Sequence, residues 1–199
     1  MVYVGLTGNI GSGKTTVSRL FSMFNVPIYY ADERGKNFLE TPETLLMIRE
    51  AFGDAYIDDE GKPDKKKIAA LVFGDIEKLE ILNQIIHPQV RKDFSNWAAR
   101  QTHHPYVIME AAILFESGQH KNFQKIIIVT APKKLRIERV CIRDRVKSED
   151  VEKRMRHQMA EEDIAALADF VINNDGQELL MPQVESVHNQ IIAYCKQCK

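Results

Sequence analysis

The chain has 199 residues, of which 44% are hydrophobic and 28% charged, and its formal net charge is −1 at pH 7. This length allows one domain with a real core and insertions, and the near-zero charge gives no basic field for nucleic acid. No apolar run approaches the roughly 20 residues that span a bilayer, and the three cysteines are too few for a disulfide framework. We therefore expect a cytoplasmic protein without nucleic-acid or membrane partners, and nothing in the sequence indicates its oligomeric state.

The most informative stretch lies at the N-terminus. An apolar run at residues 2–6 predicts a buried parallel strand, and residues 8–15, GNIGSGKT, fit the phosphate-loop pattern G-x-x-x-x-G-K-[ST]. Apolar residues then recur at helical spacing in residues 17–24, as in an amphipathic helix. Strand, glycine-rich loop and helix form the context that the motif requires, which favours a nucleotide site over a glycine-rich turn without a ligand.

The residue types of this loop suit a triphosphate. Glycines at its turns let backbone N–H groups point inward at the start of a helix, where the partial positive charge favours an anion. Lys14 can reach the β- and γ-phosphates, and the hydroxyl of Thr15 can bind Mg²⁺. The predicted ATP-binding residues of the loop are Gly11, Ser12, Gly13, Lys14, Thr15 and Thr16.

A second strand is predicted over residues 26–31, with Asp32 directly after it. In an open parallel sheet the carboxyl ends of the strands share one edge, where ligands bind. Asp32 is therefore the candidate base for a hydroxyl that receives a phosphoryl group and a candidate to hold Mg²⁺ through water. The alternative is a helix cap for the next segment.

Residues 33–101 contain helical patterns only. One helix is predicted from Pro42 to Phe52, a second begins at Asp64, a third at Asp75, and a fourth starts at Pro88. So many residues are too long for a loop, and we expect an all-helical domain for the second substrate, with a packing appendage as the alternative. The triplet at residues 65–67, which begins with Lys65, either is solvated or draws a phosphorylated substrate.

Three further strands are predicted over residues 106–109, 125–130 and 170–172. Strands that alternate with helices predict a three-layer α/β/α fold with a five-stranded, mostly parallel sheet. Glu110 closes the third strand and serves either as an acid near the metal or in a structural role. The pattern Asn-Lys-x-Asp that reads guanine is absent from the sequence.

Arginines gather after the fourth strand. Arg136, Arg139 and Arg143 share one helix face by their spacing, and further arginines follow closely. Beside a phosphate loop such a cluster favours a closing lid that brings cations to the transferred phosphoryl group, and a solvated face is the alternative. A last helix is predicted over 180–191, and Cys195 and Cys198 are expected in a solvated tail.

Separated stretches, in order over about residues 2–180, resemble the dephospho-coenzyme A kinase family, a group of small P-loop kinases. The stretches are the loop from Gly5 to Lys14, Ala31-Asp32, Gly61-Lys62-Pro63-Asp64, Ile86-His87-Pro88, Ile113-Leu114-Phe115-Glu116-Ser117, Arg139 with Arg143-Asp144 and Arg154, Gln158-Met159, and Ala168–Ile172 with Asn174 and Gly176. The chain departs from the family pattern at Asn9, where glycine is commoner, at Ala112, often proline, and at Tyr30, often aspartate.

The resemblance implies transfer of the γ-phosphoryl group of ATP to the ribose 3′-hydroxyl of dephospho-coenzyme A, with Mg²⁺ as cofactor. Together with the residue types, this assigns Asp32 as the base, Lys14 and Arg143 as catalytic cations and Arg139 and Asn174 to ATP, and it places His87, Phe115 and Lys65 at the acceptor. The expected division is a nucleotide-binding core (1–32, 102–138 and 166–199), an acceptor domain (33–101) and a lid (139–165). The alternatives are another small-molecule P-loop kinase, of a nucleotide or shikimate type, and a non-catalytic nucleotide-binding module.

Overall fold

The computed structural model describes residues 1–58, 60–73 and 75–198, without the side chains at positions 65, 69, 72, 73 and 76. It divides into two compact units. The first joins residues 1–30 to residues 101–199, and the second contains residues 31–100. No helix in the described ranges is long and apolar enough to cross a membrane.

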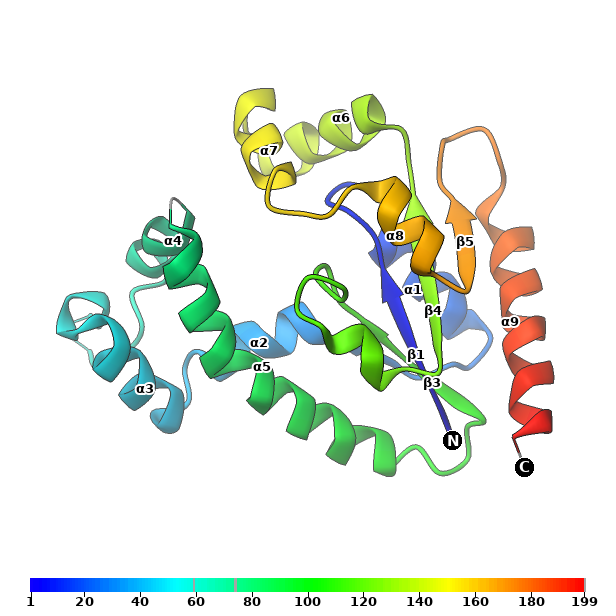
Figure 1. Cartoon of the computed structure of the whole chain (residues 1–199), viewed down its shortest axis with the longest axis horizontal. Coiled ribbons are helices and arrows are strands. Elements are labelled where there is room, and N and C mark those ends of the chain that lie inside the picture. Colours follow the sequence, from blue (N-terminus) through cyan, green and yellow to red (C-terminus); the bar gives the residue numbers. More distant parts are fainter. Residues whose placement is uncertain (59, 74, 199) are drawn as a thin grey trace. The chain divides into compact units, whose positions relative to one another are not determined.

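The first unit is built on a five-stranded sheet in the order β2-β3-β1-β4-β5 (Figure 1). All four neighbouring pairs are parallel, which confirms the predicted sheet. The strands are β1 (Val2–Thr7), β2 (Ile28–Tyr30), β3 (Tyr106–Glu110), β4 (Lys125–Thr130) and β5 (Phe170–Asn173). Strands β1, β3 and β4 are almost entirely buried, which is why their sequences read as continuous apolar runs.

Alternation along β1 assigns its two faces to different layers. Val4 and Leu6 belong to the core that includes Phe21 of α1 (Lys14–Met23) and Val184 of α9 (Leu180–Gln197). Gly5 points to the other face, where an added Cβ would lie 2.5 Å from the Leu114 side chain. In Figure 1 the segment after β3 and helix α8 (Glu161–Leu167) cover that second face, so the unit has the predicted three layers.

The remaining helices of this unit follow β3 and β4. A 3₁₀ turn covers Gln119–Asn122, and the helical hairpin of α6 (Lys133–Asp144) and α7 (Ser148–Met155) follows β4. The predicted lid boundary at residue 139 falls inside α6, so the segment proposed to move shares a helix with the core.

The end of the chain differs from the expected solvated tail. Helix α9 continues to Gln197, and Cys195 is only 5% exposed within the core, whereas Cys198 is exposed. Cys195 extends the buried stripe of Val187 and Ile191 by one further turn, and a thiol packs there as a small apolar group.

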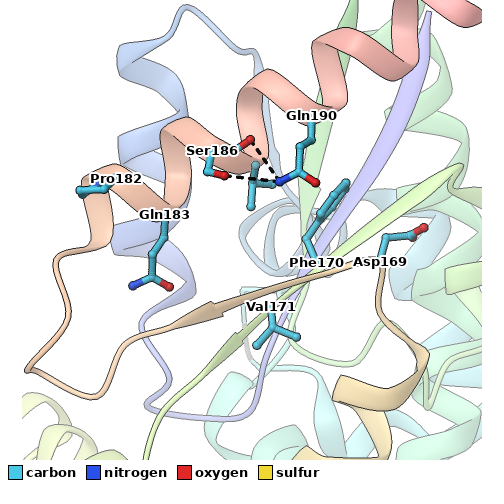
Figure 2. Close-up of a pocket in the computed structure, with 8 residues that line it drawn as sticks. Asp169, Phe170, Val171, Pro182, Gln183, Ser186 and Gln190 are labelled. Carbon is cyan, nitrogen blue, oxygen red and sulfur yellow. Dashed lines mark hydrogen bonds between the residues drawn. The ribbon is translucent and has the colours of Figure 1, made fainter.

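Strand β5 forms one edge of the sheet, and α9 protects part of it. The Gln183 side chain accepts from the backbone N–H of Asn173 at 2.8 Å and donates to its carbonyl at 3.0 Å. Figure 2 shows Gln183 beside β5, in a shallow groove that Phe170, Ser186 and Gln190 also line. A side chain that occupies edge hydrogen-bonding groups hinders pairing with another strand.

The second unit is helical, as the sequence predicts. Its elements are α2 (Ala31–Phe38), α3 (Pro42–Phe52), a 3₁₀ turn at Asp54–Tyr56, α4 (Lys65–Phe73) and α5 (Ile76–Ala99). The Thr41 side chain accepts from the Thr44 N–H at the start of α3, and Asp75 accepts from the Lys78 N–H at the start of α5.

Two predicted boundaries in this region are wrong. The second strand ends at Tyr30 because Ala31 already belongs to α2, whose first turn holds Asp32 and Glu33. The helix expected to start at Pro88 instead continues through it as α5. Proline removes one N–H from the ladder, but the buried stripe of Ile86, Val90 and Phe94 stays in register across it and holds the helix together.

Candidate active site

The phosphate loop connects β1 to α1, and its backbone accounts for its glycines. Gly11 has φ 81° and Gly13 has φ 100°, which side chains rarely adopt. A Cβ on Gly11 would also collide with the Arg136 carbonyl, and one on Gly13 with the Asn174 amide. Gly13 caps α1 without any side-chain hydrogen bond. The start of the helix therefore presents backbone N–H groups, and no capping side chain, to a ligand.

Lys14 and Thr15 open α1 in contrasting surroundings. The Lys14 ammonium donates to the Gly8 carbonyl at 2.7 Å and so lies back over the loop. The Thr15 hydroxyl lies 3.4 and 3.5 Å from the two carboxylate oxygens of Glu110, at the end of β3. The Ser18 hydroxyl, one turn further along α1, lies 3.4 Å from the same carboxylate. Thr15 and Glu110, which the sequence could not link, therefore meet.

Glu110 gives this corner its charge. The residue is 8% exposed, and the hydroxyls of Thr15 and Ser18 both face it. Oxygen ligands of this kind suit Mg²⁺, which commonly combines one or two protein groups with substrate phosphates. In the described part of the chain no group of three or more His, Cys, Asp or Glu residues forms a metal cage. The Thr15 hydroxyl with the Glu110 carboxylate behind it fits a metal that is shared with a nucleotide.

Asn174 links the phosphate loop to α6. Its side-chain amide donates to the Ser12 carbonyl at 2.7 Å, and its carbonyl oxygen accepts from Arg139 at 3.3 Å. Its backbone N–H binds the Thr130 carbonyl at the end of β4. Two residues that the sequence assigned to ATP thus contact each other beside the loop. One guanidinium nitrogen of Arg139 is buried without a hydrogen-bond partner in the described ranges.

Arg143 is held at the tip of the hairpin. Its guanidinium donates to both carboxylate oxygens of Asp144, at 2.7 and 3.1 Å, and Arg154 of α7 donates to the same carboxylate at 3.0 Å. These hydrogen bonds raise the pKa of Arg143, and those from Arg143 lower the pKa of Asp144. The Arg143 side chain is 63% exposed, so it is open to solvent on the side that Asp144 does not cover.

Arg136 does not share the environment of Arg139 and Arg143, although its spacing predicts one face. It is buried, donates to the Ala131 carbonyl at 2.9 Å and lies 3.5 Å from Glu161 at the start of α8. Burial raises the pKa of Glu161, and the charge of Arg136 opposes that shift. Arg136 therefore joins α6 to α8, a role that side-chain spacing alone does not reveal.

The segment between α7 and α8 contacts the phosphate loop directly. Gln158 accepts from the Ile10 N–H at 2.8 Å, and Asn9 donates to the Met159 carbonyl at 3.1 Å. Met159 in turn donates to Glu116 at 3.0 Å. Only the family resemblance drew attention to Gln158 and Met159, and residue type alone gives no signal for these contacts.

Phe115 lies in the segment after β3. It is 7% exposed and stacks on His120 with ring centroids 4.8 Å apart. In the first unit the structure thus assembles Lys14, Thr15, Arg139 and Asn174 around the loop, while the ring of Phe115 is occupied by an internal contact. The acceptor role of Phe115 stays a prediction.

The second unit contains Asp32 and His87. Asp32 is exposed in the first turn of α2, and His87 lies on α5. Burial lowers the pKa of His87 and the charge of Arg91 lowers it further, while Asp32 raises it. Helix α2 packs on α5, since Arg34 pairs with Asp93 at 3.0 Å, so Asp32 and His87 interact within one unit. The side chain of Lys65, also predicted at the acceptor, lies outside the described residues.

Comparison with known proteins identifies the family. The family model for dephospho-CoA kinase matches residues 2–179. A dephospho-CoA kinase of Chlorobaculum tepidum is 40% identical over 197 residues, which cover 95% of this chain and 94% of that protein. One of Bacteroides fragilis is 37% identical over 184 residues, with coverages of 92% and 89%.

Solved structures agree with this assignment. The TT1252 protein from Thermus thermophilus has a TM-score of 0.82 at 30% identity and covers 97% of each chain. Dephospho-CoA kinase from Campylobacter jejuni has a TM-score of 0.68 at 25% identity, with coverages of 95% and 96%. A shikimate kinase from Acinetobacter baumannii, at 16% identity and a TM-score of 0.55, shares the P-loop kinase fold. The site and these matches together show that the chain belongs to the dephospho-CoA kinase family.

Proposed function

We propose that this enzyme transfers the γ-phosphoryl group of ATP to the ribose 3′-hydroxyl of dephospho-coenzyme A, which gives coenzyme A and ADP. Its family supports an ATP-dependent kinase that completes coenzyme A biosynthesis. The observation that carries the proposal is the phosphate loop at the start of α1, with Thr15 facing the buried carboxylate of Glu110. The partners are ATP and dephospho-coenzyme A, and the proposed location is the cytoplasm.

The loop holds the nucleotide phosphates. Backbone N–H groups from Gly11 to Thr16 form the cradle, and Lys14 turns from the Gly8 carbonyl to the β- and γ-phosphates. The hydroxyl of Thr15 would hold Mg²⁺, with Glu110 behind that hydroxyl, and Asp32 is proposed to assist through water. When bound, Mg²⁺ neutralises charge on the β- and γ-phosphate oxygens.

Asp32 accepts the proton in this scheme. The bond between the 3′-oxygen and the γ-phosphorus forms while the bond to the β-phosphate oxygen breaks, and the hydroxyl proton passes to the Asp32 carboxylate. Chain connectivity supports the assignment. Tyr30 pairs with Glu110 in the sheet, and Asp32 follows Tyr30 by two residues, a reach of about 7 Å along the backbone.

The α6–α7 hairpin supplies cations. Arg143 moves from Asp144 to the transferring phosphoryl group when the lid, residues 139–165, closes, and Arg139 assists. An exposed guanidinium held by an adjacent carboxylate can exchange that partner for a phosphate at modest cost. Asn174, which already touches the loop, contacts the adenine end of ATP.

The helical unit is proposed as the acceptor domain. His87 and Lys65 belong to it, and Phe115 from the core completes the set of residues proposed to hold dephospho-coenzyme A. The lowered pKa of His87 keeps its imidazole neutral at pH 7, so it acts as a hydrogen-bonding group rather than as a cation.

An acceptor panel tests the proposal. ADP release from ATP is followed with dephospho-coenzyme A, a nucleoside monophosphate or shikimate, and the product is located by mass spectrometry after cleavage of the pyrophosphate. We expect release with dephospho-coenzyme A and a 3′-phosphate on its adenosine half. Release only with another acceptor would assign a different small-molecule kinase, and ATP binding without release would indicate a nucleotide-binding module.

A further inference from the structure

We infer that Gln158 is a positioning residue for ATP. It holds the phosphate loop at Ile10 and fixes the base of the α6–α7 hairpin, and it does so without touching the nucleotide. The inference rests on the proposed binding of ATP by this loop. The clasp, as we call residues 158 and 159, lies between the end of α7 and the start of α8.

The first contact fixes a peptide of the loop itself. The side-chain carbonyl of Gln158 accepts from the Ile10 N–H at 2.8 Å, a strong geometry for a neutral bond. Ile10 directly precedes Gly11, the first of the loop residues that we propose bind the phosphates. A loop whose donors are already oriented loses less entropy when the anion binds, so the Gln158 bond contributes to the affinity for phosphate from outside the cradle.

The second contact comes from a residue in which this chain departs from the family pattern. Asn9 is 6% exposed and donates to the Met159 carbonyl at 3.1 Å, a bond that glycine at this position could not make. The Met159 N–H donates to Glu116 at 3.0 Å. The clasp thus joins the phosphate loop to the segment after β3. Gln158 binds Ile10 of the loop, and Met159 binds both Asn9 of the loop and Glu116 of that segment.

The clasp also determines which part of the hairpin can move. Helix α6 follows β4 directly, and the chain returns to the clasp three residues after α7 ends at Met155. With both ends of the hairpin fixed, only part of the lid proposed over residues 139–165 moves, namely its tip, where Arg143 and Arg154 share Asp144. Gln158 therefore fixes the base of the hairpin beside the phosphate loop and leaves the tip with its arginines able to move.

The test compares Gln158→Met with a matched control; the substitution keeps length and removes both the acceptor for Ile10 and the amide donor that lies 3.5 Å from the Ala112 carbonyl. Gln124 also accepts from a backbone N–H, that of Tyr3 at 2.7 Å, at the start of β1, the end of that strand opposite to the phosphate loop. Binding of ATP, ADP and adenosine is measured by calorimetry for wild type, Gln158→Met, Gln124→Met and Lys14→Ala. Amide hydrogen exchange at Ile10 reports on the clasp bond directly.

We expect Gln158→Met to weaken ATP and ADP about fivefold, the effect of one neutral hydrogen bond, to leave adenosine binding unchanged and to speed exchange at Ile10. Gln124→Met should alter none of these. The role of the clasp would be overturned if Gln158→Met weakened adenosine binding as much as ATP binding. It would also be overturned if Gln158→Met left ATP binding unchanged while Lys14→Ala weakened ATP binding; in both cases the phosphate site would stand. Unchanged ATP binding in Lys14→Ala would overturn the phosphate site itself.

If Gln158→Met fails to fold, Asn9→Ala provides the same comparison. It removes the bond to the Met159 carbonyl and leaves the Ile10 bond in place. We expect a smaller loss of ATP affinity than the fivefold of Gln158→Met, about twofold for a partly lost clasp, again with adenosine unchanged. Wild-type affinity for ATP in a folded Asn9→Ala protein would contradict the inference.

Discussion

At the residue scale, Glu110 shows how the site depends on one charge at a strand end. Its carboxylate is nearly buried, and two hydroxyls of α1 face it. A buried carboxylate is costly unless hydrogen bonds or a cation compensate it. Its place behind Thr15 supports the proposal that it orients the metal ligand of the phosphate loop, one of the two roles that the sequence left open.

The variant Glu110→Gln tests that role, since it keeps size and removes the charge. We expect kcat to fall about 10- to 100-fold, the usual cost of losing a partner behind a metal ligand, and the Mg²⁺ concentration for half-maximal rate to rise. A Mg²⁺ titration of the rate provides the measurement, with Glu185→Gln on the exposed face of α9 as control. An unchanged Mg²⁺ requirement would leave Glu110 with a structural role only.

At the element scale, the junction of β1 and α1 combines two demands on its glycines. The backbone at Gly11 is left-handed, and the Arg136 carbonyl of α6 lies where a Cβ would project. Gly118 has a similar φ of 68°, but nothing lies within 4 Å of its Cβ position. A substitution at Gly118 therefore measures the cost of backbone strain alone, whereas one at Gly11 adds the cost of the close approach to the Arg136 carbonyl.

We expect Gly118→Ala to lower the free energy of unfolding by about 1–2 kcal/mol, the cost of the left-handed backbone. Gly11→Ala should cost more and should also abolish tight ATP binding, because the loop must move away from α6. Urea denaturation and ATP titration give the two quantities. Equal destabilisation with normal ATP affinity in Gly11→Ala would show that the close approach is not required.

The α6–α7 hairpin is the element proposed to act in the transition state. Arg143→Ala should lower kcat by about 10³-fold or more, as for other arginines that stabilise phosphoryl transfer, while the Kd of ATP changes little. The exposed Arg156 of the same hairpin is the control. A parallel loss of affinity and rate would indicate ordinary binding of ATP in the ground state instead.

The same elements show what the sequence could predict. Every strand and the loop–helix junction follow from apolar runs, turn residues and the motif, because these are local signals. The continuation of α5 through Pro88 depends on packing across the proline, and the burial of Arg136 depends on Glu161, which lies 25 residues further along the chain. Contacts between distant segments, such as Gln158 with Ile10, leave no local pattern.

At the scale of the whole molecule, two compact units each contain a histidine that favours the neutral form. Burial lowers the pKa of His188 in the first unit and of His87 in the second. His188 Nδ1 lies 2.7 Å from the Tyr106 hydroxyl, whose pKa burial raises, and the tautomer of His188 sets which of the two groups donates. The ring also stacks on Phe24.

These shifts predict how stability depends on pH. The unfolded histidines bind protons near pH 6.5, whereas the folded ones resist protonation, so the unfolded state binds more protons below that pH. The free energy of unfolding should therefore be highest above about pH 6.5, where these histidines are neutral in both states, and should fall as the pH drops below that value. In urea titrations His188→Gln should reduce this dependence, and an unchanged slope would exclude His188 as a source.

The central claim concerns both units, since it assigns the triphosphate to the loop of the first and the base to Asp32 of the second. Single-turnover phosphoryl transfer to dephospho-coenzyme A by Asp32→Asn tests it most directly, with Glu33→Gln, from the same first turn of α2, as control. We predict a rate about 10²- to 10⁴-fold lower for Asp32→Asn, an unchanged Kd for ATP and normal transfer by the control. Transfer by Asp32→Asn at the wild-type rate would contradict the account.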